Sequence, residues 1–181
     1  MLPLDDPRWL ELDHRHWSNG RPLGSEVVFV PHELRWIAEN PRDAKRFDDL
    51  WPYLCSEGTA WPAAYAAVPH LVASARSIPP AARGDLLYVV GLIVICSGEF
   101  GATGSDVPDD IAEAYRAALP EALALITEQL ATPRPAVDTR YLLAATAALQ
   151  GHVDLGDFLN ALHPGAECES CGEPYYPAGH P

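Results

Sequence analysis

Basic residues are scarce in this chain. Its 181 residues include 12 Lys and Arg against 25 Asp and Glu, which gives a formal net charge of -13 at pH 7. A protein this acidic repels polyphosphates and anionic lipid headgroups, so we expect no general binding to nucleic acid or to a membrane surface. A basic protein partner would be attracted and would associate faster. The same charge also keeps a protein soluble, so acidity alone does not identify a partner.

The sequence also lacks a long apolar run. The longest, residues 86–96, has about 11 residues, whereas a membrane-spanning helix needs about 20. The first residues, MLPLDDPRW, carry an acidic pair where a signal peptide has Lys or Arg. Cysteine is rare as well, and Cys55 and Cys96 lie in apolar segments that we expect to be helical. That placement favours a reducing compartment over a disulfide framework, and we expect a cytoplasmic protein.

Helical periodicity is what the chain does have. Apolar residues recur every three or four positions in six segments, which predicts helices over 32–40, 41–56, 60–77, 107–131, 137–150 and 155–162. Gly58 is expected to end one helix, Thr59 to cap the next, and Pro62 to lie in its first turn. Residues 85–97 are apolar nearly all round and predict a central buried helix. A buried strand is the alternative, because Val and Ile are frequent there.

The predicted helices group into pairs over residues 32–56, 60–98 and 107–150. A period of about 40 residues is typical of HEAT-type repeats. Pro52, Pro69 and Pro120 fall inside predicted helices and favour bends, hence curvature. We predict an all-α, HEAT-like curved stack of about seven helices in one domain, residues 1–163, with one concave face free. An irregular arm, residues 1–31, precedes the stack, and a polar Pro/Gly-rich tail, residues 164–181, follows it.

Several short motifs of the first half of the chain resemble a known family. They are Trp9, Leu12 and His14; Leu50, Trp51 and Leu54; Gly58 and Thr59; and Ala66, Ala67, Val68, Pro69 and Leu71. This series is similar to that of bacterial HEAT-like proteins that are common in actinobacteria and often linked to polymorphic-toxin loci. The resemblance covers roughly residues 9–98 by motif. It implies a helical binding protein, and for some members an immunity protein that neutralises a toxin.

A protein-binding face would combine acidic residues with aromatic anchors. We predict that Trp36, Asp48, Asp49, Asp109 and Asp110 contribute to it. Trp36 belongs to the least apolar helix, whereas the other aromatic side chains are expected to pack in the core. The helix dipole gives Asp109 and Asp110 an alternative role, because acids stabilise the first turn of a helix. The favoured function is therefore non-catalytic binding of a protein, with a basic toxin as the specific version.

The tail carries a Cys-x-x-Cys-Gly motif at Cys168 and Cys171. Such a turn directs two sulfurs to one cation, and His163 and His180 complete a set of four zinc ligands. A zinc-binding regulatory or scaffold protein is thus the second functional hypothesis. A redox dithiol and a plain turn remain open as alternatives.

A cluster of Asp13, His14 and His16 supports a third hypothesis, a metal-assisted enzyme. Imidazoles two residues apart do not share a helical face, so the cluster makes a weak metal site. No Ser/His/Asp triad is recognisable, and no serine has the context of a nucleophile elbow. The sequence therefore favours binding over catalysis, and it leaves the oligomeric state open.

Overall fold

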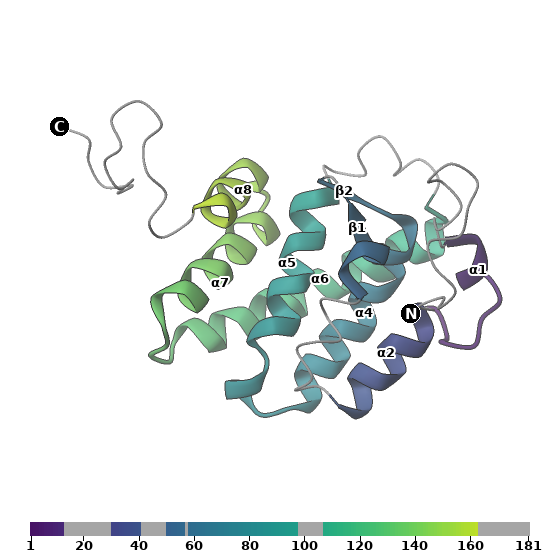
Figure 1. Cartoon of the computed structure of the whole chain (residues 1–181), viewed down its shortest axis with the longest axis horizontal. Helices are drawn as coiled ribbons and strands as arrows, with labels where there is room; N and C mark the ends of the chain where they lie inside the picture. Colours follow the sequence, from purple (N-terminus) through teal and green to yellow (C-terminus); the bar gives the residue numbers. More distant parts are fainter. Residues whose placement is uncertain (13–29, 41–49, 57, 98–106, 163–181) are drawn as a thin grey trace.

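The computed structural model describes residues 1–12, 30–40, 50–56, 58–97 and 107–162. These residues are mostly helical, so the predicted all-α class is confirmed (Figure 1). The elements are α1 (Trp9–Leu12), α2 (Val30–Glu39), the helical residues 50–54, β1 (Cys55–Ser56), β2 (Thr59–Ala60), α4 (Pro62–Ser77), the 3-10 helix η1 (Pro80–Ala82), α5 (Gly84–Ser97), α6 (Asp109–Leu130), α7 (Ala136–Leu149) and α8 (Val153–Ala161). In this described part, no helix has both the length and the apolar character needed to cross a bilayer.

The longer helices pack in two layers. Helix α4 packs between α2 and α6 in one layer, and α5 packs on α7 in the other. Successive helices also contact each other across the layers, α4 with α5 and α6 with α7. Helix α8 packs mainly on α7 and less on α5. Among the described residues, the α7–α8 pair therefore forms one end, and α1 and α2 lie toward the other end (Figure 1).

The most apolar segment is helical, as predicted, and the strand alternative is wrong. Helix α5 contacts α4, α6, α7 and α8, so it is enclosed on several sides. Leu86, Leu87, Val90 and Ile93 are completely buried there. A helix surrounded by other helices needs apolar side chains around most of its circumference, which explains why the segment shows no polar face.

Small residues let the helices of the second layer approach closely. A Cβ atom added at Gly91 of α5 would lie 2.2 Å from the Cβ of Ala145 in α7. A Cβ atom added at Gly156 of α8 would lie 2.9 Å from the carbonyl oxygen of Ala144. Both distances are far shorter than ordinary van der Waals contact. Glycine is therefore required at these two positions by the space available.

The turn before α4 differs from the prediction. Thr59 does not cap a helix, and Cys55 is not helical. Strands β1 and β2 pair antiparallel, with Cys55 opposite Ala60, and Gly58 turns the chain with a φ of 74°. The Trp61 amide then donates to the Leu54 carbonyl at 2.8 Å, which extends the pairing. Helix α4 begins after this pairing, and Pro62 lies in its first turn, as predicted.

The N-terminal segment is packed on the helices. Trp9 is buried, and its Nε1–H donates to the Pro3 carbonyl at 2.8 Å. The Nε2 atom of His70, in α4, lies 2.8 Å from the Leu2 carbonyl oxygen, and the His70 ring contacts that of Trp9. Because a carbonyl can only accept, Nε2 carries the proton. His70 therefore connects α4 to the first residues of the chain.

Candidate functional site

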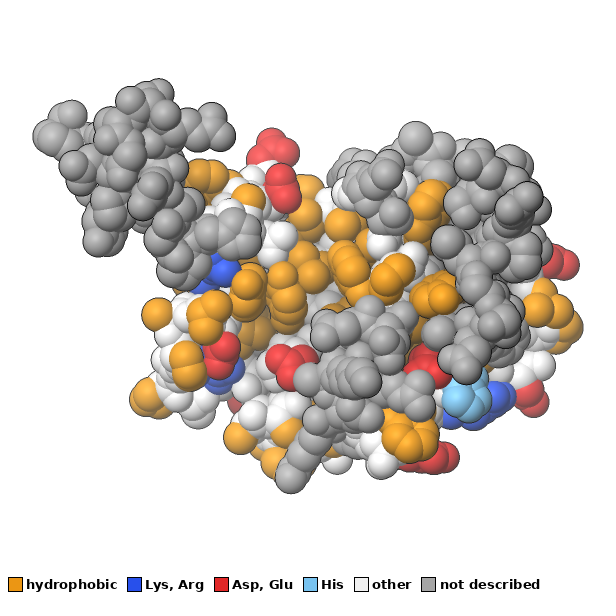
Figure 2. All heavy atoms as spheres, viewed as in Figure 1, with side chains coloured by type: hydrophobic (Ala, Val, Ile, Leu, Met, Phe, Trp, Pro, Cys, Tyr) orange, Lys and Arg blue, Asp and Glu red, His pale blue; other side chains and the backbone are white. Residues whose placement is uncertain are grey.

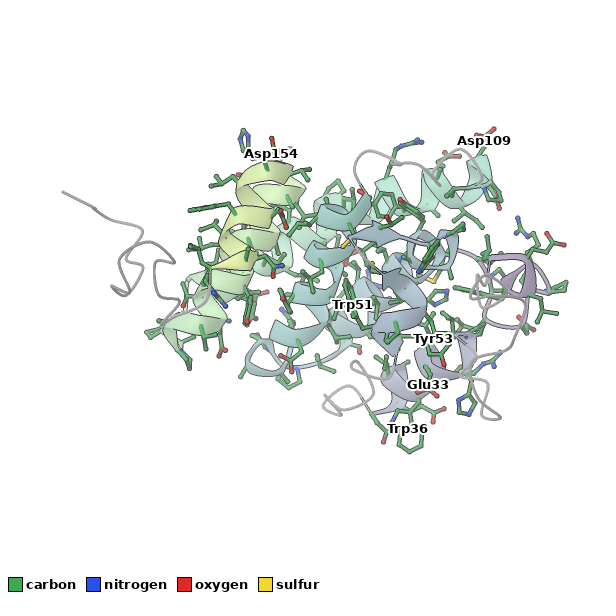
Figure 3. All side chains as sticks on the ribbon, turned by 45° about the horizontal axis from the view of Figure 1, so that its top comes forward. Glu33, Trp36, Trp51, Tyr53, Asp109 and Asp154 are labelled. Carbon is green, nitrogen blue, oxygen red and sulfur yellow. The ribbon has the colours of Figure 1, made fainter. Side chains whose placement is uncertain are left out.

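The predicted partner-binding residues do not form one patch in the part of the chain that the structure describes. Trp36 lies on α2, and Asp109 and Asp110 open α6. Figure 3 places Trp36 and Asp109 on well-separated parts of the molecule. Trp36 is 36% exposed, and both aspartates are exposed. Asp48 and Asp49 fall outside the described residues, so their contribution stays a prediction.

Asp110 is already engaged by the protein itself. Arg8 donates through Nη1 to Asp110 at 2.8 Å, and its Nε and Nη2 atoms donate to the Asp6 carboxylate. These hydrogen bonds from Arg8 hold the pKa of both carboxyl groups below the ordinary value. The Arg8–Asp110 bond ties the N-terminal segment to the first turn of α6. A structural role thus accounts for Asp110 without a partner.

Neither predicted metal site can be compared with the structure. The residues concerned lie outside the described residues: Asp13, His14, His16, His163, Cys168, Cys171 and His180. Within the described ranges, three or more His, Cys, Asp or Glu side chains nowhere come together in a way that would hold a metal ion. The zinc and enzyme hypotheses therefore stay predictions.

Glu33 is a buried carboxylate that the sequence did not predict. It lies on α2, and its side chain is 4% exposed. The Nδ1 atom of exposed His32 is 3.1 Å from a Glu33 carboxylate oxygen. A carboxylate on the inner face of an amphipathic helix is costly to bury unless it is paired, and this contact supplies part of that compensation. No apolar-polar pattern reveals such a residue, because the pattern assigns acids to the outer face.

A shallow pocket lies between the N-terminal ends of α5 and α7, with a volume of about 260 Å³. Tyr88 and Tyr141 line it, with ring centroids 4.4 Å apart. The guanidinium of Arg140 lies 4.4 Å over the Tyr141 ring, and the Tyr88 hydroxyl donates to Asn160 of α8 at 2.8 Å. Burial raises the pKa of Tyr88 to about 12, which keeps this hydroxyl a donor. The tyrosine pair therefore connects α5 with α7 through the ring contact and α5 with α8 through the hydrogen bond.

The strongest candidate surface lies on α8, where large apolar side chains are exposed. Leu155 is 50% and Phe158 is 46% exposed, and Leu159 and Leu162 are half-buried. Their spacing of three and four residues places these four side chains on one side of the helix. We call these four residues the α8 surface. The sequence predicted a helix from this stripe, and in the structure only Gly156 of α8 is buried.

Acidic and further apolar side chains are exposed on α8 and on the neighbouring helix. Asp154 and Asp157 are exposed on the same helix, and Leu143 of α7, the helix on which α8 packs, is 44% exposed. Figure 2 shows further apolar side chains across the middle of one face, over α5, where Tyr88, Leu92 and Ile95 are half-buried. An apolar centre with a charged rim is typical of protein-binding surfaces.

Comparison of the chain with protein-family models, with curated proteins and with solved structures gave no match, so the function is argued from the geometry of the chain.

Proposed function

We propose that this chain is a non-catalytic protein-binding protein with a HEAT-like stack of helices, and that it binds its partner through the α8 surface. The observation that carries the proposal is the exposure of Leu155 and Phe158 on the last described helix. Contiguous apolar side chains of this size are uncommon on the surface of a monomeric protein, and they mark sites where another protein binds.

The two-layer packing supports the HEAT-like part of the proposal. Helices α4 and α6 pack side by side in one layer, α5 and α7 in the other, and each successive pair spans the layers. This is how neighbouring helical hairpins stack in a solenoid, where every unit contacts the next one in both layers.

The charge of the chain indicates a basic partner. Asp154 and Asp157 are exposed on the same helix as the α8 surface, and the whole chain carries a formal charge of -13. Opposite charges speed association and fix orientation, whereas the buried apolar side chains supply most of the affinity. The resemblance to HEAT-like proteins of toxin loci makes a basic toxin, such as a nuclease, the specific version of this proposal.

The test is binding and protection with the product of a toxin-like gene next to the gene of this chain. Phe158→Ala and Leu155→Ala should each weaken the complex about tenfold or more, the loss usual at the centre of an interface. Leu10→Ala is the matched control, because Leu10 is 61% exposed on α1, at the other end of the molecule. Its affinity should stay within about twofold of the wild type.

Two results would contradict the proposal. If the purified chain binds no such product and gives no protection to cells that express it, the toxin partner is wrong. If a complex forms but is weakened by Trp36→Ala and not by Phe158→Ala, the partner binds on α2 instead of α8.

A further inference from the structure

Two cysteine side chains from distant parts of the sequence meet beside the β-hairpin. Cys55 belongs to β1, and Cys96 is the second-last residue of α5. The hairpin packs on α5 through β2, and this packing brings the two thiols close enough for each to shift the pKa of the other. Both are free thiols in the structure. No local motif links them, so the fold itself has brought them together.

The two thiols have different surroundings. Cys55 is 2% exposed, whereas Cys96 is half-buried. The contact between the two thiols raises the pKa of Cys55 and lowers the pKa of Cys96. Burial raises the pKa of Cys55 further. At Cys96, burial and the Asp157 carboxylate both act in the opposite direction and raise the pKa. Because the thiolate is the reactive form, the more exposed Cys96, whose pKa is lowered, is the thiol better placed to react first.

Aromatic side chains enclose the same place. Tyr65 of α4 and Tyr115 of α6 meet edge to face, with ring centroids 5.1 Å apart, and both are buried. Burial raises the pKa of both tyrosines, and the nearby cysteines add to this shift, Cys55 and Cys96 at Tyr65 and Cys55 at Tyr115. Cys55 is therefore shielded from solvent by these rings, and the Cys96 sulfur is the group through which it can be oxidised.

We propose that Cys55 and Cys96 form a peroxide-sensitive dithiol, in which Cys96 is oxidised first and Cys55 resolves it to a reversible disulfide. The inference rests on the meeting of the two thiols and on their unequal exposure. It is independent of the protein-binding function proposed above.

The chemistry uses hydrogen peroxide as the oxidant and balances in two steps. The Cys96 thiolate attacks one peroxide oxygen, the O–O bond breaks, and the hydroxide that leaves takes up a proton to become water. Cys96 is now a sulfenic acid. The Cys55 sulfur then attacks the Cys96 sulfur, the S–O bond breaks, and a second water leaves with the proton of Cys55. The two thiols lose two electrons, and the peroxide is reduced to two waters.

The experiment treats the folded chain with hydrogen peroxide, blocks the remaining thiols, and maps disulfides by mass spectrometry of peptides. We expect a peptide pair that joins Cys55 to Cys96, with the loss of two hydrogens, reversed by dithiothreitol. Mapping separates this bond from any bond between Cys168 and Cys171. The double variant Cys168→Ser/Cys171→Ser should lose the same two hydrogens, because it keeps the proposed pair.

Single substitutions in that double variant test the order of events. With Cys55→Ser added, the sulfenic acid should persist on Cys96 and be trapped by dimedone. With Cys96→Ser added, Cys55 should remain unmodified, because nothing exposes it to the oxidant. Far-UV circular dichroism checks that each variant is folded. The proposal is overturned if the wild-type chain yields no Cys55–Cys96 peptide pair while both thiols react after unfolding, or if dimedone labels Cys55 instead of Cys96.

Discussion

Replacing Gly91 by alanine tests the close crossing of α5 and α7 most directly. The new Cβ would lie 2.2 Å from the Cβ and 2.6 Å from the Cα of Ala145. Carbon atoms prefer about 3.5–4.0 Å, so the helices must separate by roughly 1.5 Å. Such overpacking costs about 1–3 kcal/mol, and more where the backbone is in the way, whereas the helix gains only about 1 kcal/mol from losing a glycine. We therefore expect a net loss of about 2 kcal/mol, or roughly 4–8 °C in Tm.

Thermal and urea denaturation, followed by circular dichroism, measure this loss. Gly84→Ala is the matched control, because Gly84 opens the same helix and a Cβ there meets nothing within 4 Å. It should leave the stability unchanged or raise it slightly. Adding Ala145→Gly to Gly91→Ala should restore only part of the loss, since the contact with the Cα remains. Gly91→Ala protein as stable as Gly84→Ala protein would refute the crossing as described.

Two further predictions concern polar contacts. Burial lowers the pKa of His70 in the folded state, so the unfolded chain takes up this proton first, and stability should fall as the pH drops below about 6.5. His70→Gln does not titrate and should reduce that slope in urea denaturation, and an unchanged slope would contradict the role of His70. Arg83 donates to the Ile78 carbonyl at 2.9 Å and to Glu128 at 2.6 Å, and its side chain is 11% exposed. Arg83→Met should therefore lower the free energy of unfolding by about 1–3 kcal/mol in the same assay. Glu128 is 55% exposed, so Glu128→Gln should lower it by less than about 1 kcal/mol. Equal losses for the two variants would refute this ranking.

The helices of this fold could be predicted because their signals are local. Spaced apolar residues, Pro62 in a first turn and the apolar segment over 85–97 each act within a few turns of the chain. The hairpin at Cys55 and Ala60 gave no such signal, since strands of two residues are too short to show alternation. Its residues were therefore assigned to the neighbouring helices.

The candidate surface was only half predictable. The stripe of Leu155 and Phe158 is visible in the sequence, but its exposure depends on which helices remain to cover it, a property of the whole stack. The same holds for the meeting of Cys55 with Cys96 and of Gly91 with Ala145. Each pair joins residues about 40 or more positions apart, and one sequence contains no measure of that proximity.

Among the described elements, helix α8 packs chiefly on α7 and less on α5, and of its nine residues only Gly156 is buried. Nine residues are too few for a helix to persist by itself in water, so its stability depends on this packing. Its amide protons should exchange with solvent sooner than those of α5, through openings that leave the rest of the molecule intact. A protein that covers Phe158 would then also stabilise α8 against these openings, and part of its binding free energy would be used to order the helix.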